Sequence, residues 1–485
     1  MEWIRINKKD NVAVAITDIE KNQLIKKGHK FALRDIAKGE KVIKYGAPIG
    51  IATKDIAEGD WVHVHNVRTL LDTGGGYTYE KVCEKTVERE KESRRTFFGY
   101  RREDGRCGVR NEIWIICTVG CVNSVADEIA RLMRDEAKRY TDGIVVIKHP
   151  YGCSQMGEDQ QATLRVLSRM AIHPNAGGVL MLGLGCENCN FNKLAEIFPK
   201  GYMENTERMK WLSCQDEDDE VKRGMELVRE LISYTGKFSR IEIDANELVI
   251  GLKCGGSDGL SGITANPLVG RFSDRHCGRG GSIILTEVPE MFGAEQFLMN
   301  RCADRETYEK TVKMIENFKE YYRSNGQVIY ENPSPGNKAG GITTLEDKSL
   351  GCIQKGGEAE VTDVLRYGDP VNRTGLSLLE GPGNDLVAVT ALAVSGAHMV
   401  LFTTGRGTPL GGIVPVVKIA SNHEVAEKKA HWTDFDAERV MDGSLWEVLT
   451  DELDEYVLNV ASGKKTRSEK NGYRDMAIFK RGVTL

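Results

Sequence analysis

The densest group of chemically active side chains lies in residues 253–267, with the sequence KCGGSDGLSGITANP, directly after the apolar run 248–252. Glycines let a backbone approach a ligand closely and turn its N–H groups toward that ligand. Short hydroxyl, carboxylate and amide side chains suit a hydroxyl-rich small molecule, or a metal held through oxygen and sulfur. A tight turn alone would explain the glycines but not these side chains. The segment therefore predicts a binding site, whose candidate substrate ligands are Ser257, Asp258, Ser261, Thr264 and Asn266.

Cysteines recur in the loops that follow the predicted buried strands. Four such loops carry Cys121, Cys153, Cys186 and Cys254, and a fifth thiol, Cys352, lies in a later Leu-Gly-Cys segment. Because ligands bind beyond the carboxyl ends of the strands in open α/β sheets, several of these thiols are expected to converge. The predicted metal ligands among them are Cys153, Cys186, Cys254 and Cys352. The alternative is that each cysteine is a small residue filling a tight turn.

Three histidines in the first 70 residues form a second group. The segment 61–66, WVHVHN, places His63 and His65 two residues apart, which on a strand puts both rings on the same face. His29 comes from the same small segment of chain. Two imidazoles on one face and a third nearby could hold a first-row divalent metal, so His29, His63 and His65 are predicted metal or substrate ligands. The alternative is a half-exposed strand with surface histidines.

Two polar residues near the C-terminus complete the candidate substrate ligands. Arg406 lies between glycines in residues 405–412, GRGTPLGG, which lack the GxxxxGK[ST] pattern of a phosphate loop. A guanidinium group in such a loop favours bidentate binding of a carboxylate. Asn384 lies in the predicted cap of a helix over residues 386–394.

The elements that must position these residues divide the chain into regions. Residues 32–42 and 52–62 are an internal repeat of two short strands joined by an Ala-x-Gly turn, so residues 1–75 are predicted to form a small β-rich domain. The glycines at 74–76 and the charge run 80–95 indicate a linker over residues 76–96, with a docking arm as the alternative.

From residue 97 onward the pattern alternates between apolar strands and amphipathic helices. Strands are expected at 111–117, 143–148, 178–183, 248–252 and 398–403, and Asn123 is expected to cap a helix that runs to about residue 140. Such alternation is typical of mostly parallel sheets. We therefore predict an α/β fold: the small β-rich domain followed by a large glycine-rich α/β region, divided into domains at 97–240 and 241–485.

Composition restricts the classes of function. The chain has 485 residues, 28% charged residues and a net charge of only −5, which gives no indication of a nucleic-acid or membrane-surface partner. No apolar run reaches the length of about 18 residues that a transmembrane helix needs, and the N-terminus lacks a signal-peptide core. We expect a cytoplasmic protein whose 12 cysteines stay reduced. A homo-oligomer is compatible with the sequence.

Several longer motifs resemble the altronate/galactarate dehydratase family of sugar-acid dehydratases. They are residues 98–111, 254–267, 286–295, 337–346, 380–385 and 405–412, with a first segment similar to the SAF domain at 28–30 and 63–66. The resemblance covers nearly the whole chain. It implies the elimination of water from a six-carbon aldonic or aldaric acid to give a 2-keto-3-deoxy acid, with Fe²⁺ or Mn²⁺ as cofactor. Uninterrupted fusion of the two parts is more similar to the altronate dehydratases than to the sulfolactate lyases, whose two parts are separate subunits. The expected substrate is D-altronate, with galactarate or another sugar acid as the alternative.

The implied reaction requires a general base for the C2 proton and assistance for the departing C3 hydroxyl. A metal bound to the carboxylate would stabilise the enediolate-like intermediate. The candidate bases are His63, His65, Lys30 and Lys253, with the histidines first because their ordinary pKa suits the task. An iron–sulfur cluster is the alternative to a mononuclear metal, and a non-catalytic sugar-acid sensor is the alternative from another class of protein.

Overall fold

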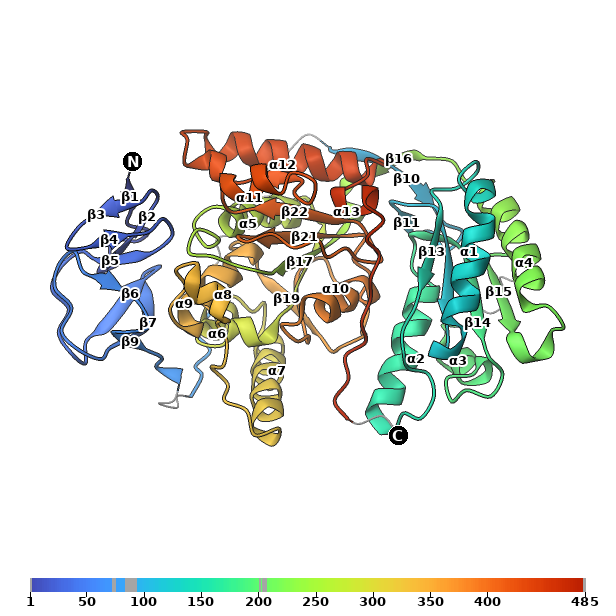
Figure 1. The fold of residues 1–485 in the computed structure, drawn as a ribbon, viewed down its shortest axis with the longest axis horizontal. Helices are drawn as coiled ribbons and strands as arrows, with labels where there is room; N and C mark the ends of the chain where they lie inside the picture. Colours follow the sequence, from blue (N-terminus) through green and yellow to red (C-terminus); the bar gives the residue numbers. More distant parts are fainter. Residues whose placement is uncertain (1, 72–75, 83–93, 200–201, 203–206, 483–485) are drawn as a thin grey trace.

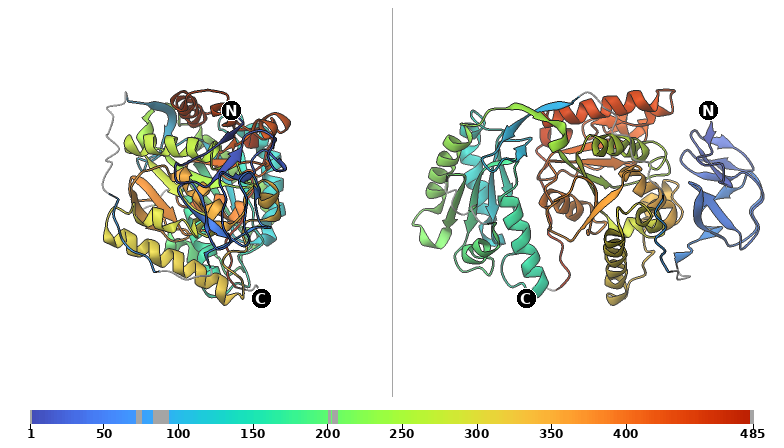
Figure 2. Two further views of the ribbon diagram at one scale, coloured as in Figure 1. Left: turned by 90° about the vertical axis from the view of Figure 1, so that its left-hand side faces the viewer. Right: turned by 180° about the vertical axis from the view of Figure 1, so that it is seen from behind.

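The chain folds into three parts arranged in a row. The computed structural model describes residues 2–71, 76–82, 94–199, 202 and 207–482. The C-terminal domain (245–482) lies in the middle, the N-terminal β-domain (2–71) packs on one flank, and the second domain (94–244) lies on the other (Figure 1). The same order is seen from behind, where the β-domain and the second domain remain on opposite sides (Figure 2). The β-domain can therefore contribute side chains only to the C-terminal domain.

The β-domain is built from short antiparallel strands. They are β1 (Trp3–Ile4), β2 (Val12–Ala15), β3 (Ile19–Glu20), β4 (Leu24–Ile25), β5 (Lys30–Ala32), β6 (Lys41–Lys44), β7 (Ala47–Ala52), β8 (Trp61–Val62) and β9 (Val67–Arg68). Among the described residues they form the sheets β1-β2-β5-β8, β6-β7-β9 and β3-β4.

The predicted internal repeat is confirmed, and its two copies pair with each other. Ile36 and Ile56 occupy equivalent positions and form an antiparallel bridge. Each copy closes the same turn, in which a carboxylate accepts a backbone N–H three residues before it, from Ala37 to Glu40 and from Ala57 to Asp60. The β-rich character of this region follows from the repeated turn.

Residues 76–82 run along the C-terminal domain. The Tyr77 hydroxyl donates to Glu295 and Glu316 at 2.9 and 3.0 Å, and the Val82 N–H donates to the Asn300 carbonyl at 3.1 Å. Residues 83–93, which hold most of the predicted charge run, lie outside the described residues.

The second domain contains a parallel four-stranded sheet in the order β13-β12-β14-β15. Its strands are β12 (Glu112–Cys117), β13 (Ile144–Ile147), β14 (Ala176–Gly183) and β15 (Met209–Ser213); its helices are α1 (Asn123–Ala137), α2 (Gly157–Ala171), α3 (Phe191–Ile197) and α4 (Glu220–Thr235). A separate small sheet consists of β10 (Thr96–Arg101), β11 (Cys107–Gly108) and β16 (Ile241–Asp244). Alternate residues of β12 pack against α1 and α4 or against α2, as the two faces of a strand require.

The predicted cap at Asn123 is wrong. A 3₁₀ turn over Gly120–Val122 leads directly into α1, so Asn123 is the first helical residue and no side chain caps the helix. Its amide instead donates to the His149 carbonyl at 3.1 Å and joins two loops of the sheet edge.

The C-terminal domain is built on a seven-stranded parallel sheet in the order β19-β20-β18-β17-β21-β22-β23. Its strands are β17 (Val249–Cys254), β18 (Ser282–Leu285), β19 (Val361–Leu365), β20 (Gly375–Leu379), β21 (Met399–Thr404), β22 (Val416–Ala420) and β23 (Phe435–Asp436). The helices are α5 (Ala265–Gly278), α6 (Glu295–Met299), α7 (Arg305–Ser324), α8 (Pro335–Ala339), α9 (Leu345–Cys352), α10 (Asp385–Val394), α11 (His423–Lys428), α12 (Trp446–Ala461) and α13 (Arg467–Lys470). The predicted α/β class with parallel sheets is confirmed.

The second and C-terminal domains share one apolar core. A single cluster of buried side chains extends from Trp114 and Ile116 of β12 to Val389 of α10 and Val400 of β21. Contiguous apolar burial of this kind holds two domains as one body, because separating them would expose the cluster to water.

The β-domain docks on the C-terminal domain where three glycine backbones meet. A side chain at Gly259 would place its Cβ 1.9 Å from the Gly28 carbonyl oxygen, and one at Gly341 would place it 2.3 Å from the same atom. Only residues without a Cβ allow this approach. The contact brings β5 and the residues around it against the loop 255–262 and the loop before α9.

Within the described part of the chain, no helix has both the length and the apolar character needed to cross a membrane.

Candidate active site

Two thiols and a carboxylate meet beyond the carboxyl ends of the central strands. Cys254 ends β17, Glu290 lies in the 3₁₀ turn Val288–Met291 that follows β18, and Cys352 is the last residue of α9. The two sulfurs are 3.3 Å apart, and Glu290 Oε2 lies 3.0 Å from the Cys254 sulfur and 3.1 Å from the Cys352 sulfur. All three side chains are buried. They are the one group of three potential metal ligands within 4.8 Å of one another among the residues described.

Six charged side chains, Glu290 among them, make up the centre together with the two thiols. Three ammonium groups meet three carboxylates: Lys253, Lys348 and Lys355 face Glu287, Glu290 and Asp385. Lys348 Nζ lies 2.8 Å from Glu290, and Lys253 Nζ lies 2.9 Å from Asp385 and also contacts Glu287. Burial, with the neighbouring Cys254 and Glu290, raises the pKa of Glu287 well above its ordinary value. When all three carboxylates and both thiols are ionised, the charge of the centre is −2. A divalent cation would neutralise that charge, as burial in a low dielectric demands.

The thiols and the carboxylate have strongly perturbed acidities. The hydrogen bond from Cys352 lowers the pKa of Cys254 to about 6, against the opposing effect of burial. The same hydrogen bond, together with burial, raises the pKa of Cys352 well above its ordinary value. Burial alone would raise the pKa of Glu290, but the ammonium groups of Lys348, Lys253 and Lys355 outweigh it and lower the pKa below its ordinary value. Cys254 and Glu290 are therefore ready to ligate as anions near neutral pH.

The ligand set fits a thiophilic divalent metal. Two thiolates about 2.3 Å from a tetrahedral ion lie about 3.8 Å apart, so the Cys254 and Cys352 sulfurs would need to separate by only about half an ångström. Sulfur ligands favour iron or zinc over magnesium and calcium. Glu287, beside the centre, has a left-handed backbone with φ 74°, an unusual conformation for a residue with a side chain and one that is often found at functional sites.

A second polar cluster lies where the β-domain meets helix α9. Lys30 Nζ is 2.8 Å and Lys44 Nζ 3.0 Å from the carboxylate of Asp347, and Lys30 also donates to the Gly341 carbonyl at 2.7 Å. His63 Nδ1 lies 3.1 Å from the Thr343 hydroxyl, and His29 Nε2 lies 3.3 Å from the Ala339 carbonyl. Helix α9 thus joins the two clusters, because Asp347 faces the β-domain lysines while Lys348 and Cys352 belong to the thiol centre.

The prediction that His63 and His65 share one face of a strand is wrong. Strand β8 ends at Val62, and residues 63–66 form a turn. The cause is Asn66, whose side-chain oxygen accepts the His63 N–H at 2.8 Å and pulls the chain round. His63 is therefore buried against the C-terminal domain, whereas His65 is exposed and its ring lies over Trp61.

The four candidate bases differ in acidity. Burial, with the neighbouring Lys44, lowers the pKa of Lys30 to about 8 in spite of Asp347. Burial and Lys30 lower the pKa of His63 to about 3, and burial lowers that of the exposed His65 less far. Glu287 and Asp385 overcome burial and raise the pKa of Lys253 well above its ordinary value. At neutral pH, Lys253 is thus a fixed cation, and Lys30 has the pKa closest to the range that a general base needs.

Several of the predicted substrate ligands have hydrogen bonds within the protein. Asp258 accepts from Ser261, from the Ser421 hydroxyl at 2.8 Å and from the Asn422 amide at 2.9 Å. Thr264 donates to the Ser421 carbonyl, Asn266 bridges Gly351 and Thr403, and Asn384 caps α10. Ser257 is buried, and its carbonyl accepts from Asn337. These contacts fix the loop 255–266, so its polar groups shape the site.

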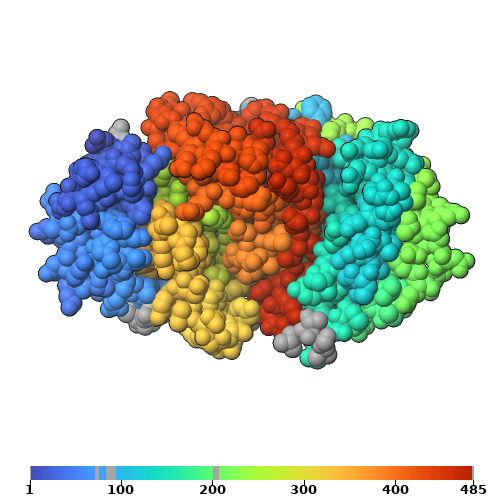
Figure 3. Space-filling view, viewed as in Figure 1, coloured from blue at the N-terminus to red at the C-terminus, as the bar shows by residue number. Residues whose placement is uncertain are grey.

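Arg406 is exposed and faces a cavity of about 320 Å³ between the β-domain and the C-terminal domain. The wall of this cavity also includes Asp258, Gly340 and the three lysines Lys27, Lys428 and Lys429. Figure 3 shows that the surface is hollowed on this side, where the segments coloured yellow and orange-red meet. Glu424 is also in the wall and Lys27 pairs with Glu438, but basic groups remain in excess, which suits an anionic ligand.

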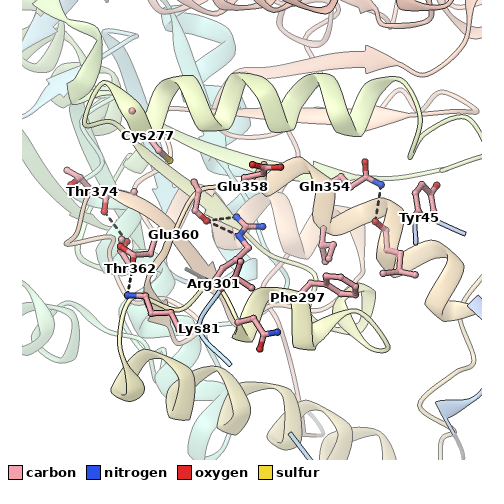
Figure 4. A pocket seen from close by; sticks show the side chains of 18 of the residues that line it. Tyr45, Lys81, Cys277, Phe297, Arg301, Gln354, Glu358, Glu360, Thr362 and Thr374 are labelled. Carbon is pink, nitrogen blue, oxygen red and sulfur yellow. Dashed lines mark hydrogen bonds and ion pairs between the residues drawn. The ribbon is translucent and has the colours of Figure 1, made fainter. Parts of the chain in front are cut away.

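A larger cavity, of about 1000 Å³, lies elsewhere, lined by the C-terminal domain together with Tyr45 of the β-domain and Lys81 of the segment 76–82. Its walls contain none of the predicted site residues (Figure 4). Lys81 in its wall pairs with Glu360 at 3.2 Å, and Arg301 donates to the Ala359 and Gly356 carbonyls. Its size therefore does not indicate the site of chemistry.

The predicted convergence of the thiols holds only in part. Cys254 and Cys352 meet, but Cys153 and Cys186 follow strands of the four-stranded sheet, in the second domain. That sheet lies on the flank of the C-terminal domain opposite the β-domain (Figure 1). Glu290, Asp347, Lys348 and Lys355 were not predicted from the sequence. The motif 286–295 contains Glu290 and the motif 337–346 ends next to Asp347, but nothing in either motif marks which polar residue is buried.

Family models match three consecutive parts of the chain. They are "Altronate/galactarate dehydratase SAF domain" at residues 1–70, "D-galactarate dehydratase/Altronate hydrolase, second domain" at residues 99–235 and "D-galactarate/Altronate dehydratase, C-terminal" at residues 245–484. An altronate dehydratase of Escherichia coli (strain K12) is 50% identical over 504 aligned positions, with 100% of both chains covered. The chain belongs to the altronate/galactarate dehydratase family.

Two further relatives agree with this assignment. The altronate dehydratase of Bacillus subtilis (strain 168) is 49% identical and covers 100% of this chain and 99% of its own length. The galactarate dehydratase (L-threo-forming) of Escherichia coli (strain K12) is 32% identical and covers 98% of this chain and 96% of its own length. The predicted family and its N-terminal SAF domain, here the β-domain, are confirmed.

If Cys254, Glu290 and Cys352 hold a metal, removing one ligand should release it. We expect Cys254→Ser and Glu290→Gln each to lose about one metal ion per chain and to lower turnover at least about a hundredfold. Elemental analysis of anaerobically purified protein measures the first effect. Cys277→Ser, which changes a half-buried thiol of the same domain, is the matched control. Unchanged metal content in both ligand variants would remove this centre from the account.

Proposed function

We propose that the chain is a hydro-lyase that converts D-altronate to 2-keto-3-deoxy-D-gluconate. The observation that carries the substrate is the match of the whole chain, at 50% and 49% identity, to two altronate dehydratases, against 32% to a galactarate dehydratase. The reaction class is supported by a buried thiol–carboxylate centre and by a basic cavity between the β-domain and the C-terminal domain.

The reaction removes the C2 proton and expels the C3 hydroxyl as water, and the enol that results rearranges to the 2-keto acid. When bound at Cys254, Glu290 and Cys352, a divalent metal supplies a Lewis acid for a substrate oxygen, and we propose Fe²⁺, with Mn²⁺ as the alternative. Lys253, Lys348 and Lys355 hold their positive charges around the thiols and keep the carboxylate of Glu290 ionised by lowering its pKa.

We assign the proton abstraction to Lys30. The C2 proton is weakly acidic, and a base is effective when its pKa lies near the working pH. Burial places the pKa of Lys30 at about 8, whereas the pKa of His63, at about 3, makes its neutral imidazole a weaker base. His63 positions the loop before α9 through Thr343, and Lys253 is too firmly paired with Glu287 and Asp385 to release a proton.

Arg406 and the lysines of the smaller cavity are proposed to bind the substrate carboxylate. Arg406 is exposed, and its only described hydrogen bond goes to the Gly336 carbonyl at 3.3 Å. Helix α8, which contains Gly336, leads inward: its Asn337 contacts Lys348, whose ammonium pairs with Glu290. The length and stereochemistry of a hexonate held at Arg406 would decide whether its far end points toward the metal ligands or away from them. Discrimination among sugar acids would arise from this difference.

The substrate assignment is tested by assaying 2-keto-3-deoxy products from a panel of hexonates and hexarates, under anaerobic conditions with ferrous iron. We expect turnover of D-altronate well above that of galactarate. Turnover of galactarate with none of altronate would overturn the substrate but keep the reaction class. Binding of sugar acids without any turnover would indicate a sensor.

The role of the β-domain is tested by Lys30→Met, His63→Ala and His65→Ala, with Lys41→Met on the exposed face of β6 as the matched control. A base acts in its unprotonated form, so kcat/KM should rise with pH up to about 8, the pKa of Lys30. We expect Lys30→Met to lower kcat at least about a hundredfold and to remove this rise. His63→Ala should have a smaller effect, and His65→Ala little. Near-wild-type kcat/KM in both Lys30→Met and His63→Ala would make the β-domain purely structural.

A further inference from the structure

Three cysteines outside the thiol centre are exposed on one edge of the second domain. They are Cys121, Cys153 and Cys186. Every other cysteine that the structure describes is buried or half-buried, which is the usual state of an unpaired cysteine. Because the thiols of Cys121, Cys153 and Cys186 are exposed, packing in a core does not explain these three cysteines.

The topology of the sheet brings these thiols to the same edge. Cys121 follows β12, Cys153 follows β13 and Cys186 follows β14. The three strands are parallel neighbours with β12 in the middle. Their loops therefore emerge side by side beyond the carboxyl ends of the strands, where α/β proteins bind ligands.

Backbone hydrogen bonds join the three loops to one another. The Gly120 N–H donates to the Tyr151 carbonyl, and the Cys189 N–H donates to the Gly152 carbonyl, both at 2.9 Å. The packing is close, because a side chain at Gly152 would put its Cβ 2.0 Å from the Thr118 carbonyl oxygen. The thiols are thus carried by a rigid frame before any ligand binds.

Further contacts brace the frame from within. The buried carboxylate of Glu187 accepts the Thr118 hydroxyl at 2.6 Å and the Gly185 N–H at 2.7 Å. Ser154, next to Cys153, has a left-handed backbone with φ 53°, and its N–H donates to the Asn188 side chain at 3.0 Å. A non-glycine residue is strained in this conformation, and such strain is common at ligand sites.

The number and spacing of the thiols restrict the ligand. The three sulfurs do not lie within 4.8 Å of one another, the limit met by Cys254, Glu290 and Cys352, so they are set too far apart for one small ion. A structural zinc site also needs four protein ligands, and the nearby Cys189 is buried beneath the loops. Clusters of iron and sulfide are larger and are held by cysteine thiolates.

We propose that Cys121, Cys153 and Cys186 bind an iron–sulfur cluster of the [4Fe–4S] type, whose fourth iron has no cysteine ligand. This site is separate from the centre at Cys254, Glu290 and Cys352 and does not depend on its function. The exposed edge leaves the cluster accessible to solvent and the fourth iron open to an external ligand.

The test measures iron and acid-labile sulfide in full-length protein, purified anaerobically and reconstituted with ferrous iron, sulfide and a reductant. The triple variant Cys121→Ser/Cys153→Ser/Cys186→Ser is compared with Cys214→Ser, a half-buried thiol of the same domain. We expect the triple variant to lose about four iron and four sulfide ions per chain, together with the electron paramagnetic resonance signal of the reduced cluster. The Cys214→Ser variant should keep the iron, the sulfide and the electron paramagnetic resonance signal.

Folding of the triple variant is checked by its thermal unfolding, and each single serine variant is measured alongside it. Wild-type protein without acid-labile sulfide after reconstitution would overturn the proposal. Equal sulfide in the triple variant would also overturn it, because the cluster would then be bound elsewhere or adventitiously. Cys254→Ser should retain the sulfide while losing turnover, so the outcome here is independent of the proposed dehydratase mechanism.

Discussion

The carboxylate of Asp347, buried between two lysines of another domain, is the contact on which the arrangement of the site depends. Lys30 and Lys44 bring two positive charges into the interface, and both reach this one side chain within 3.0 Å. Removing one partner of such a group leaves an uncompensated buried charge, at a cost of about 3–5 kcal/mol. The β-domain can therefore dock closely in only one register, with Lys30 and Lys44 opposite Asp347 of helix α9.

That register is transmitted to the thiol centre because helix α9 is short and buried throughout. One residue beyond Asp347, Lys348 pairs with Glu290, and the helix ends at Cys352. The centre pairs three lysines with three carboxylates, and burial makes any imbalance of charge expensive. The same electrostatics separate two buried lysines: Lys253 is held as a cation by Glu287 and Asp385, whereas Lys30 is left with a pKa near the physiological range. These pairings divide the proposed site into a metal-binding part around Lys253 and a proton-accepting part around Lys30.

The sequence predicted what depends on local pattern. Apolar runs predicted the buried strands, the repeated Ala-x-Gly turn predicted the β-domain, and the placement of cysteines after strands predicted that thiols would gather at sheet edges. It did not show which sheet each strand joins, so Cys153 and Cys186 were grouped with Cys254 although they belong to the second domain. The turn at His63 depends on a hydrogen bond from Asn66, which competes with strand periodicity. Glu290 and Asp347 are important because of partners 60 or more residues away in the sequence. Glu290 contacts Cys352 and Asp347 contacts Lys44, and no local sequence pattern predicts such pairing.

Measuring the ligand shell of the bound metal tests most directly whether Cys254, Glu290 and Cys352 are its ligands. X-ray absorption spectroscopy at the iron edge measures it, on anaerobic protein that carries serine at positions 121, 153 and 186 so that only this centre can hold iron. Coordination by Cys254, Cys352 and Glu290 should give sulfur neighbours at about 2.3 Å, roughly two per iron, and oxygen at about 2.1 Å. In protein that also carries Cys254→Ser, the sulfur contribution should fall by half or the iron should be lost. A shell of oxygen and nitrogen alone would contradict the account.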